Sequence, residues 1–215
     1  LDGGGPTGFV RTDSMIKARI GTDRALSVFN ELELKLGYST ETSHETYLGL
    51  TPSDFQANPD RRYSASSGDV MNWNRSGGSL IWRLIAGDNV DFRTTAYAHA
   101  LDRAWTKFNG FSDGTSAHDL LFAEPDEGLA GSYLNVLRGM EDSTGVDQRI
   151  LRGTNDRQFL NTGVASVGHW RWSNDSIENE VEVGIRWHKD DVRRFHTETA
   201  WDMRDGSLAA IDEPE

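Results

Sequence analysis

The 215-residue sequence contains no cysteine, which excludes disulfide bonds and thiolate metal sites. It also lacks the run of about 18–20 apolar residues that a transmembrane helix needs, and no segment resembles a signal peptide. Basic residues are few: 22 lysines and arginines stand against 34 acidic residues, for a formal net charge of −12. Because neutralising phosphates requires a basic surface, this balance argues against a nucleic-acid-binding protein.

The mean hydropathy is low, at −0.59. This value is compatible with a transmembrane β-barrel, because only alternate strand residues of a barrel face lipid and its loops are long and polar. The sequence starts at Leu1 instead of methionine. We therefore expect it to be a segment of a longer reading frame.

What the sequence does contain is alternation of apolar and polar residues. It is strict in residues 31–38 and 180–188, shorter in 15–20, and less regular in 78–86 and 164–172. In a helix these apolar side chains would spread around the axis, whereas in a strand they share one face. The pattern predicts an all-β protein.

The connections between these segments differ in length. Residues 22–30, 87–89 and 173–179 are short, polar and turn-like, whereas residues 41–69 and 109–149 are long. Alternating tight turns and long loops are typical of an up-and-down outer-membrane barrel, with its turns in the periplasm and its loops outside the cell. Compact soluble domains seldom contain connections of this length.

We therefore predict an antiparallel up-and-down sheet whose first strand runs inward and whose later strands alternate in direction. A short helix is expected near residues 133–138. The six predicted strands lie near residues 14–21, 30–42, 69–87, 89–108, 153–173 and 179–199.

Several segments, in this order along the chain, resemble TonB-dependent outer-membrane receptors of the ferric-citrate type. Each motif alone is weak, and the order makes the resemblance more specific. The segments are ETYLGLTPSDF (45–55), NPDRRY (58–63), FRTTAY (92–97), RAWTKFNGF (103–111), GTNDRQF (153–159) and EVGIRWH (182–188).

The resemblance implies part of a 22-stranded transmembrane barrel closed by a plug domain. Such a receptor lies in the bacterial outer membrane, contacts lipid, takes up a ferric siderophore or ferric-citrate-like chelate, and depends on the TonB complex. It is not an enzyme and needs no cofactor. We expect residues 1–215 to be one barrel segment without the plug, and its six strands to be too few to close the barrel alone.

The resemblance also suggests ligand-binding residues in the first long loop, where guanidinium groups would suit an anionic chelate. The candidates are His44, Tyr47, Arg61, Arg62 and Tyr63. The alternative is structural: Arg61 and Arg62 would pair with loop acids such as Asp54 or Asp60 and only shape the loop. We favour this alternative for the two arginines.

Other side chains have ordinary explanations. The six histidines show no metal-ligand spacing, so no metal site is expected. Acids at 124, 126 and 127 lie in a Gly/Pro-rich loop and do not by themselves indicate a hydrolase. Trp82, Trp170, Trp172 and Trp187 suit an aromatic girdle at the membrane interface, and Trp105 is a further candidate for its outer ring.

Two other architectures stay open. One is a soluble β-sandwich that binds carbohydrate through tryptophan and tyrosine, and the other is a porin-like barrel without a plug. The discriminating feature is the apolar face: a sandwich would bury Leu34 and Val183 against a second sheet, whereas a barrel would expose them to lipid.

Overall fold

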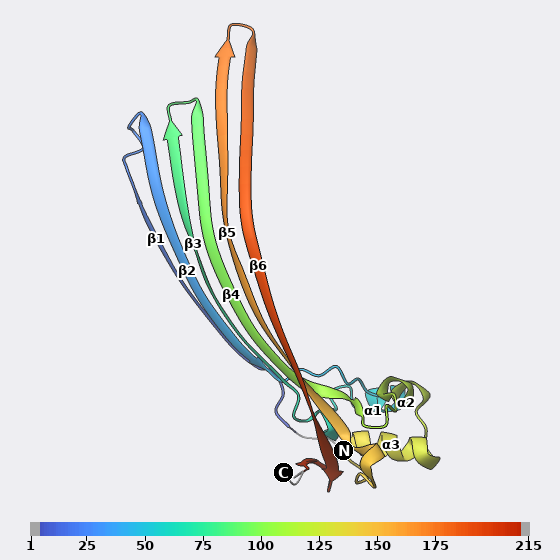
Figure 1. Ribbon diagram of the computed structural model, residues 1–215. Helices are drawn as coiled ribbons and strands as arrows, with labels where there is room; N and C mark the ends of the chain where they lie inside the picture. The colour runs from blue at the N-terminus through green and yellow to red at the C-terminus, as the bar shows by residue number, and fades with distance from the viewer. Residues whose placement is uncertain (1–4, 212–215) are drawn as a thin grey trace.

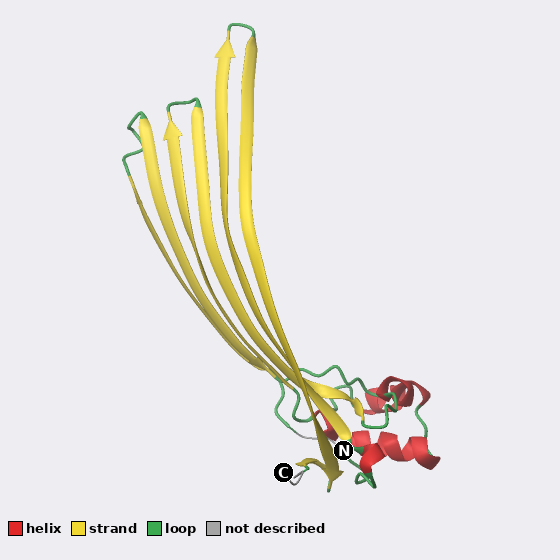
Figure 2. Cartoon of the chain, viewed as in Figure 1, coloured by secondary structure: helices red, strands yellow, loops and turns green. Residues whose placement is uncertain are grey.

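The computed structural model describes residues 5–211, which form a single antiparallel sheet with helices gathered at one end (Figures 1 and 2). Its strands neighbour one another in chain order from β1 to β7, as an up-and-down sheet requires. Their bounds are β1 (Phe9–Gly21), β2 (Val28–Ser43), β3 (Val70–Ala86), β4 (Val90–Phe111), β5 (Ile150–Asn174), β6 (Ile177–Arg204) and β7 (Ser207–Ala210).

The lengths of the connections alternate as predicted. The β1–β2, β3–β4 and β5–β6 pairs are joined by short turns at one end of the sheet, while all the helices lie at the other end (Figure 2). Residues 44–69 and 112–149 connect the strands there. We call these two loops together the loop cap.

The strand predictions were correct in number for the first six but wrong at several ends. β1 begins at Phe9, five residues before the predicted 14, and β6 continues to Arg204 instead of 199. The four-residue β7 was not predicted, because so short a segment has no measurable alternation. It pairs with the last residues of β6, from Trp201 to Arg204.

The loop cap contains more helix than predicted. The helix expected at 133–138 is α3 (Gly128–Arg138), and α1 (Pro52–Ala57) and α2 (Ala117–Ala123) were missed. Both missed helices begin with a capping hydroxyl, since Thr51 accepts from the Asp54 N–H and Ser116 from the Asp119 N–H. Two 3-10 turns, η1 (Ser64–Ser66) and η2 (Val146–Gln148), complete the cap. No helix within residues 5–211 combines the length and apolar character needed to cross a bilayer.

One face of the sheet carries a continuous band of apolar side chains. The register aligns one residue from each of six strands across this face, and the row consists of Ala18, Leu34, Leu80, Ala96, Val164 and Trp187. Leu34 is 41% exposed and Val183 is 58% exposed. Within the described residues, therefore, no second layer covers this face.

The opposite face is charged. Lys17 lies 3.0 Å and Arg19 2.6 Å from the Glu33 carboxylate, and Arg83 lies 3.0 Å from Asp91. These residues alternate with the apolar band along the same strands, so the period of two divides the sheet into an apolar and a polar face.

The hydrophobic core lies in the loop cap and not in the sheet. It combines side chains from all parts of the cap with the adjoining strand ends. Its buried members are Tyr63, Ala65, Phe108, Phe111, Leu120, Tyr133, Leu134, Val136, Leu137, Ile150 and Met203. The long loops are thus packed against one another and against the strands.

The sheet has two free edges among the described residues. β1 pairs with β2 alone, and β6 beyond β5 pairs only over its last four residues. Unpaired backbone N–H and C=O groups therefore line β1 and most of β6, and the sheet does not close on itself.

Candidate functional site

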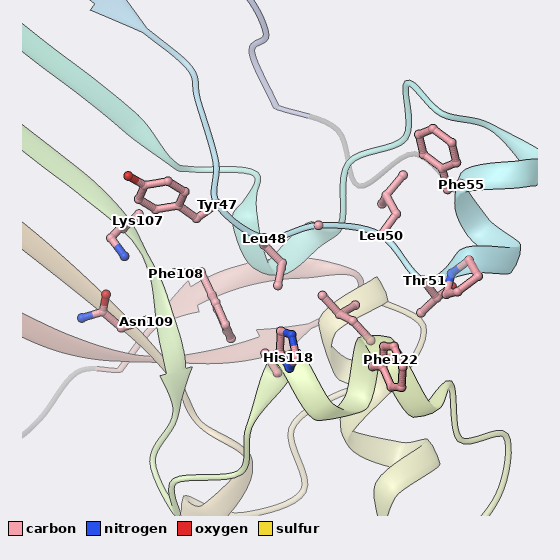
Figure 3. Close-up of a pocket in the computed structure, with 14 residues that line it drawn as sticks. Tyr47, Leu48, Leu50, Thr51, Phe55, Lys107, Phe108, Asn109, His118 and Phe122 are labelled. Atoms are coloured by element: carbon pink, nitrogen blue, oxygen red, sulfur yellow. The ribbon is translucent and has the colours of Figure 1, made fainter.

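A groove of about 650 Å³ opens in the loop cap between the chain that follows β2, the end of β4, and helix α2 (Figure 3). Its wall is mostly apolar. Phe108 lies in the middle of the labelled side chains, Tyr47 and Lys107 lie together at one end, and Phe122 lies on α2 (Figure 3).

The cationic end of the groove is built by alternation along β4. Trp105 and Lys107 are two residues apart and follow Arg103 on the polar face of the sheet. Tyr47, from the loop after β2, packs on Trp105 with ring centroids 4.4 Å apart and planes inclined by 41°. The Lys107 Nζ lies 4.9 Å from the Tyr47 ring and 5.9 Å from the Trp105 ring, both within cation–π range.

A β-bulge shapes the floor of the groove. The β4–β5 register shifts between Phe108 and Gly110, so one extra residue interrupts the alternation. Phe108 is buried in the core of the cap, while the Asn109 amide donates to Glu198 at 2.8 Å. The extra residue, Asn109, resets the alternation, and Phe108 before it and Phe111 after it are both buried in the core of the cap.

Aromatic rings around the groove are left open to solvent. Tyr47 is 70% exposed, Phe55 on α1 is 58% exposed, and Phe122 on α2 is 83% exposed. Three exposed rings around one concavity are more than the scattered apolar residues of an ordinary surface, and such concave apolar clusters are typical of binding sites.

Arg61 and Tyr63, two of the predicted ligand residues, are engaged inside the cap. Arg61 forms an ion pair with Asp54, which is the structural alternative considered from the sequence. Tyr63 is 2% exposed, and its hydroxyl donates to the Asp54 Oδ2 at 2.5 Å and accepts from the Thr51 N–H at 3.0 Å. These contacts give both residues a structural role.

Arg62 is engaged with backbone carbonyls. Its guanidinium donates to the carbonyl oxygens of Pro6 at 2.8 Å, His44 at 3.1 Å and Asp69 at 3.2 Å. Burial lowers the pKa of Arg62 below its ordinary value. His44 is half-buried at the same junction, and Tyr47 lines the groove. Ligand binding by these five residues stays a prediction.

Asp54 ties the two loops of the cap together. Besides Arg61 and Tyr63, it accepts a hydrogen bond from the Arg138 Nε at 2.8 Å, and Arg138 belongs to the second loop. Burial raises the pKa of Asp54, but hydrogen bonds from Tyr63 and Arg138 and the nearby positive charges outweigh it, so the pKa lies below its usual range. Arg138 also lies 3.5 Å from Glu124, which accepts from Ser53.

A second buried carboxylate lies where the cap meets the sheet. Asp69 is fully buried, and its Oδ1 accepts the Phe108 N–H at 2.9 Å. Burial raises the pKa of Asp69, and hydrogen bonds from Thr46 and the Phe108 N–H, together with the positive charges of Arg152 and Arg62, oppose that rise only in part. This contact fixes the strand position from which Lys107 projects.

Sequence reasoning missed most of the groove. Trp105 was considered for the outer aromatic girdle, but it lies on the polar face and stacks on Tyr47. Trp105 is two residues from both Arg103 and Lys107, and this spacing could have predicted that it lies on the polar face. Trp82 and Trp187, by contrast, share the apolar face with Leu80 and Ile185, as do Trp170 and Trp172 with Val164. Phe55 and Phe122 were not identified as site residues, because they belong to helices that were not predicted, although Phe55 lies in the receptor-like segment 45–55.

Within residues 5–211, no three histidine or acidic side chains converge in a way that could hold a metal ion. No family model matches the sequence, and no curated protein matches it either.

Proposed function

We propose that this chain forms part of the wall and outer loops of a TonB-dependent receptor in the bacterial outer membrane. In this proposal it belongs to a 22-stranded barrel with a plug domain and contributes to uptake of a ferric siderophore or ferric-citrate-like chelate. The observation that carries the proposal is the exposed apolar band across six strands, opposite a charged face.

The band has the properties that lipid requires of a barrel wall. Apolar residues at alternate positions would meet acyl chains, while the ion-paired face around Glu33 would line a polar lumen. Trp82 and Trp172 lie near the short turns, where interfacial aromatic residues are favoured. In this arrangement the turns face the periplasm and the loop cap faces the medium.

The free edges of β1 and β6 support a place inside a larger barrel. Lipid does not tolerate unpaired backbone N–H and C=O groups, so both edges need neighbouring strands. Further strands of the same receptor would satisfy them and would close the barrel around the plug. The groove beside Tyr47 and Lys107 would then open toward the barrel mouth, because Lys107 shares the polar face.

The carbohydrate-binding β-sandwich fits these observations less well. It needs a second sheet over Leu34 and Val183, and residues 5–211 contain one sheet that leaves both exposed. The plugless porin shares the exposed band with the receptor. The packed loop cap, with its aromatic groove, favours the receptor.

The test is uptake by living cells. Iron-starved bacteria that depend on this protein for a supplied ferric chelate should accumulate labelled iron, and should stop doing so when either this protein or TonB is removed. A porin would continue to admit the chelate without TonB. Uptake that is unchanged by loss of this protein would contradict the proposal.

A further inference from the structure

The groove in the loop cap contains one lysine in a mostly apolar and aromatic wall, whose other polar side chains are Thr51, Asn109 and His118. Among the described residues, no carboxylate lies within ion-pair distance of the Lys107 Nζ, whose partners are the Tyr47 and Trp105 rings. In a chain with a net charge of −12, a lysine without an acidic partner beside a cavity is a site of charge complementarity for an anion.

The apolar and aromatic side chains around the groove indicate that the anion belongs to a ligand with apolar groups. The exposed rings of Tyr47, Phe55 and Phe122 and the aliphatic side chains of Leu48 and Leu50 offer apolar contacts around the groove. Aromatic rings prefer to stack offset or edge-to-face with other rings, and they gain little from a small hydroxy acid. Phe108 lies between Tyr47 and Phe122, and Phe55 lies at the end of the labelled set away from Tyr47 (Figure 3).

We infer that this groove binds an anionic chelate that carries aromatic rings, with a ring between Tyr47 and Phe122 and a negative oxygen at the Lys107 Nζ. This inference rests on the proposed receptor function and names its ligand class as an aryl-bearing chelate instead of an aliphatic one such as ferric citrate. Lysine suits this role because its ammonium is a compact point charge. The rings of Tyr47 and Trp105 hold the Lys107 ammonium in place.

The experiment compares two ferric chelates of opposite character on the full-length protein in detergent. Ferric dihydroxybenzoate is anionic and aromatic, whereas ferric citrate is anionic and aliphatic. Binding is measured by calorimetry and by quenching of intrinsic fluorescence. We expect the unmodified protein to bind ferric dihydroxybenzoate at least about tenfold more tightly, because only that chelate can both stack and meet the lysine.

Substitutions test whether the preference for ferric dihydroxybenzoate arises in the groove. Lys107→Gln and Tyr47→Leu should each weaken binding of ferric dihydroxybenzoate by roughly fivefold, while Lys107→Arg should retain most of it. Lys35→Gln is the matched control, since Lys35 is a lysine on the same polar face of the sheet but in the middle of β2, away from the groove. It should bind like the unmodified protein.

The outcomes separate the two proposals. Equal affinity for both chelates, a preference for citrate, or a Lys107→Gln variant that matches Lys35→Gln would overturn the groove inference while leaving chelate uptake intact. Failure to bind either chelate, together with no protein-dependent iron uptake, would overturn the receptor proposal and this inference with it.

Discussion

At the scale of single residues, Asp54 holds the two loops of the cap together. One carboxylate accepts from Tyr63 and Arg138 and pairs with Arg61, so it joins the two loops with contacts that are largely shielded from water. When one partner of a shielded ion pair is removed, the other charges stay partly buried and uncompensated. The cap should therefore depend strongly on this side chain.

Replacing Asp54 with asparagine should lower the free energy of local unfolding of the cap by roughly 3 kcal/mol, because Arg61 and Arg138 lose their counter-charge. Hydrogen exchange of the α3 amides measures this quantity. Asp60→Asn is the matched control, since Asp60 forms no ion pair within residues 5–211 and should leave α3 unchanged. Equal protection in both variants would show that Asp54 does not hold the cap.

The Asp54 carboxylate also makes the stability of the loop cap depend on pH in the acidic range. Its folded-state pKa is depressed, so its contribution is complete above the unfolded-state pKa of about 3.9 and is lost as the pH falls through the lower folded-state value. We expect α3 protection, corrected for intrinsic exchange, to fall below about pH 4 in the unmodified protein. In Asp54→Asn this fall should be clearly smaller. A fall of the same size in both would assign it to other carboxylates.

At the scale of elements, α3 meets the rest of the cap at its C-cap residue, Gly139. Gly139 ends the helix with φ +77°, and a Cβ at this position would overlap the Ser64 side chain of η1. Its N–H donates to the Val136 carbonyl at 3.1 Å, and the Met140 N–H donates to the Asn135 carbonyl at 2.8 Å, which closes the helix end.

Gly139→Ala should therefore destabilise the cap by at least about 2 kcal/mol, from left-handed backbone strain together with the collision at Ser64. Gly145→Ala is the control, because its backbone is extended and a Cβ there would meet no atom within 4 Å. Thermal unfolding followed by protease cleavage within 112–149 reports both. If the two variants unfold alike, the close contact at Gly139 is not limiting.

Strands were more predictable than loops, for a physical reason. In a sheet with one apolar face, each strand repeats its burial preference every second residue, so Leu32, Leu34 and Leu36 report both the strand and its face. The cap has no such repeat: Tyr63, Ile150 and Met203 meet there from distant parts of the chain. Phe108 was placed in a strand correctly, but the bulge at Asn109, after which Phe111 also enters the core, was not predicted.

The candidate site was correspondingly less predictable than the fold. Tyr47 was identified because it belongs to the segment that resembles receptor loops, whereas Lys107 became part of the site only through contact with it. Arg61 and Arg62 were candidate ligand residues because they are cations in a long loop. In the structure their partners are Asp54 and backbone carbonyls. These ion pairs and hydrogen bonds depend on how the loop folds, and the local sequence does not predict them.

At the scale of the whole molecule, the sheet has one apolar and one charged face. No layer of residues 5–211 covers the apolar band, and in the proposed receptor this band would gain its hydrophobic stabilisation from lipid. Under this proposal the stability of the sheet would come from the bilayer and from neighbouring strands, whereas the loop cap has a hydrophobic core of its own. The two parts should respond differently to removal of lipid.

Spin labels on adjacent residues of β2 test most directly whether the apolar face meets lipid and the charged face does not. The chain has no cysteine of its own to compete for the label. Leu34→Cys and Lys35→Cys place labels on opposite faces of one strand in the protein reconstituted in lipid vesicles. We predict that the label at 34 is relaxed by oxygen dissolved in the bilayer and is shielded from a water-soluble nickel chelate, while the label at 35 shows no such preference for oxygen. A label at 34 that is shielded from both reagents, or open to the nickel chelate, would contradict the account.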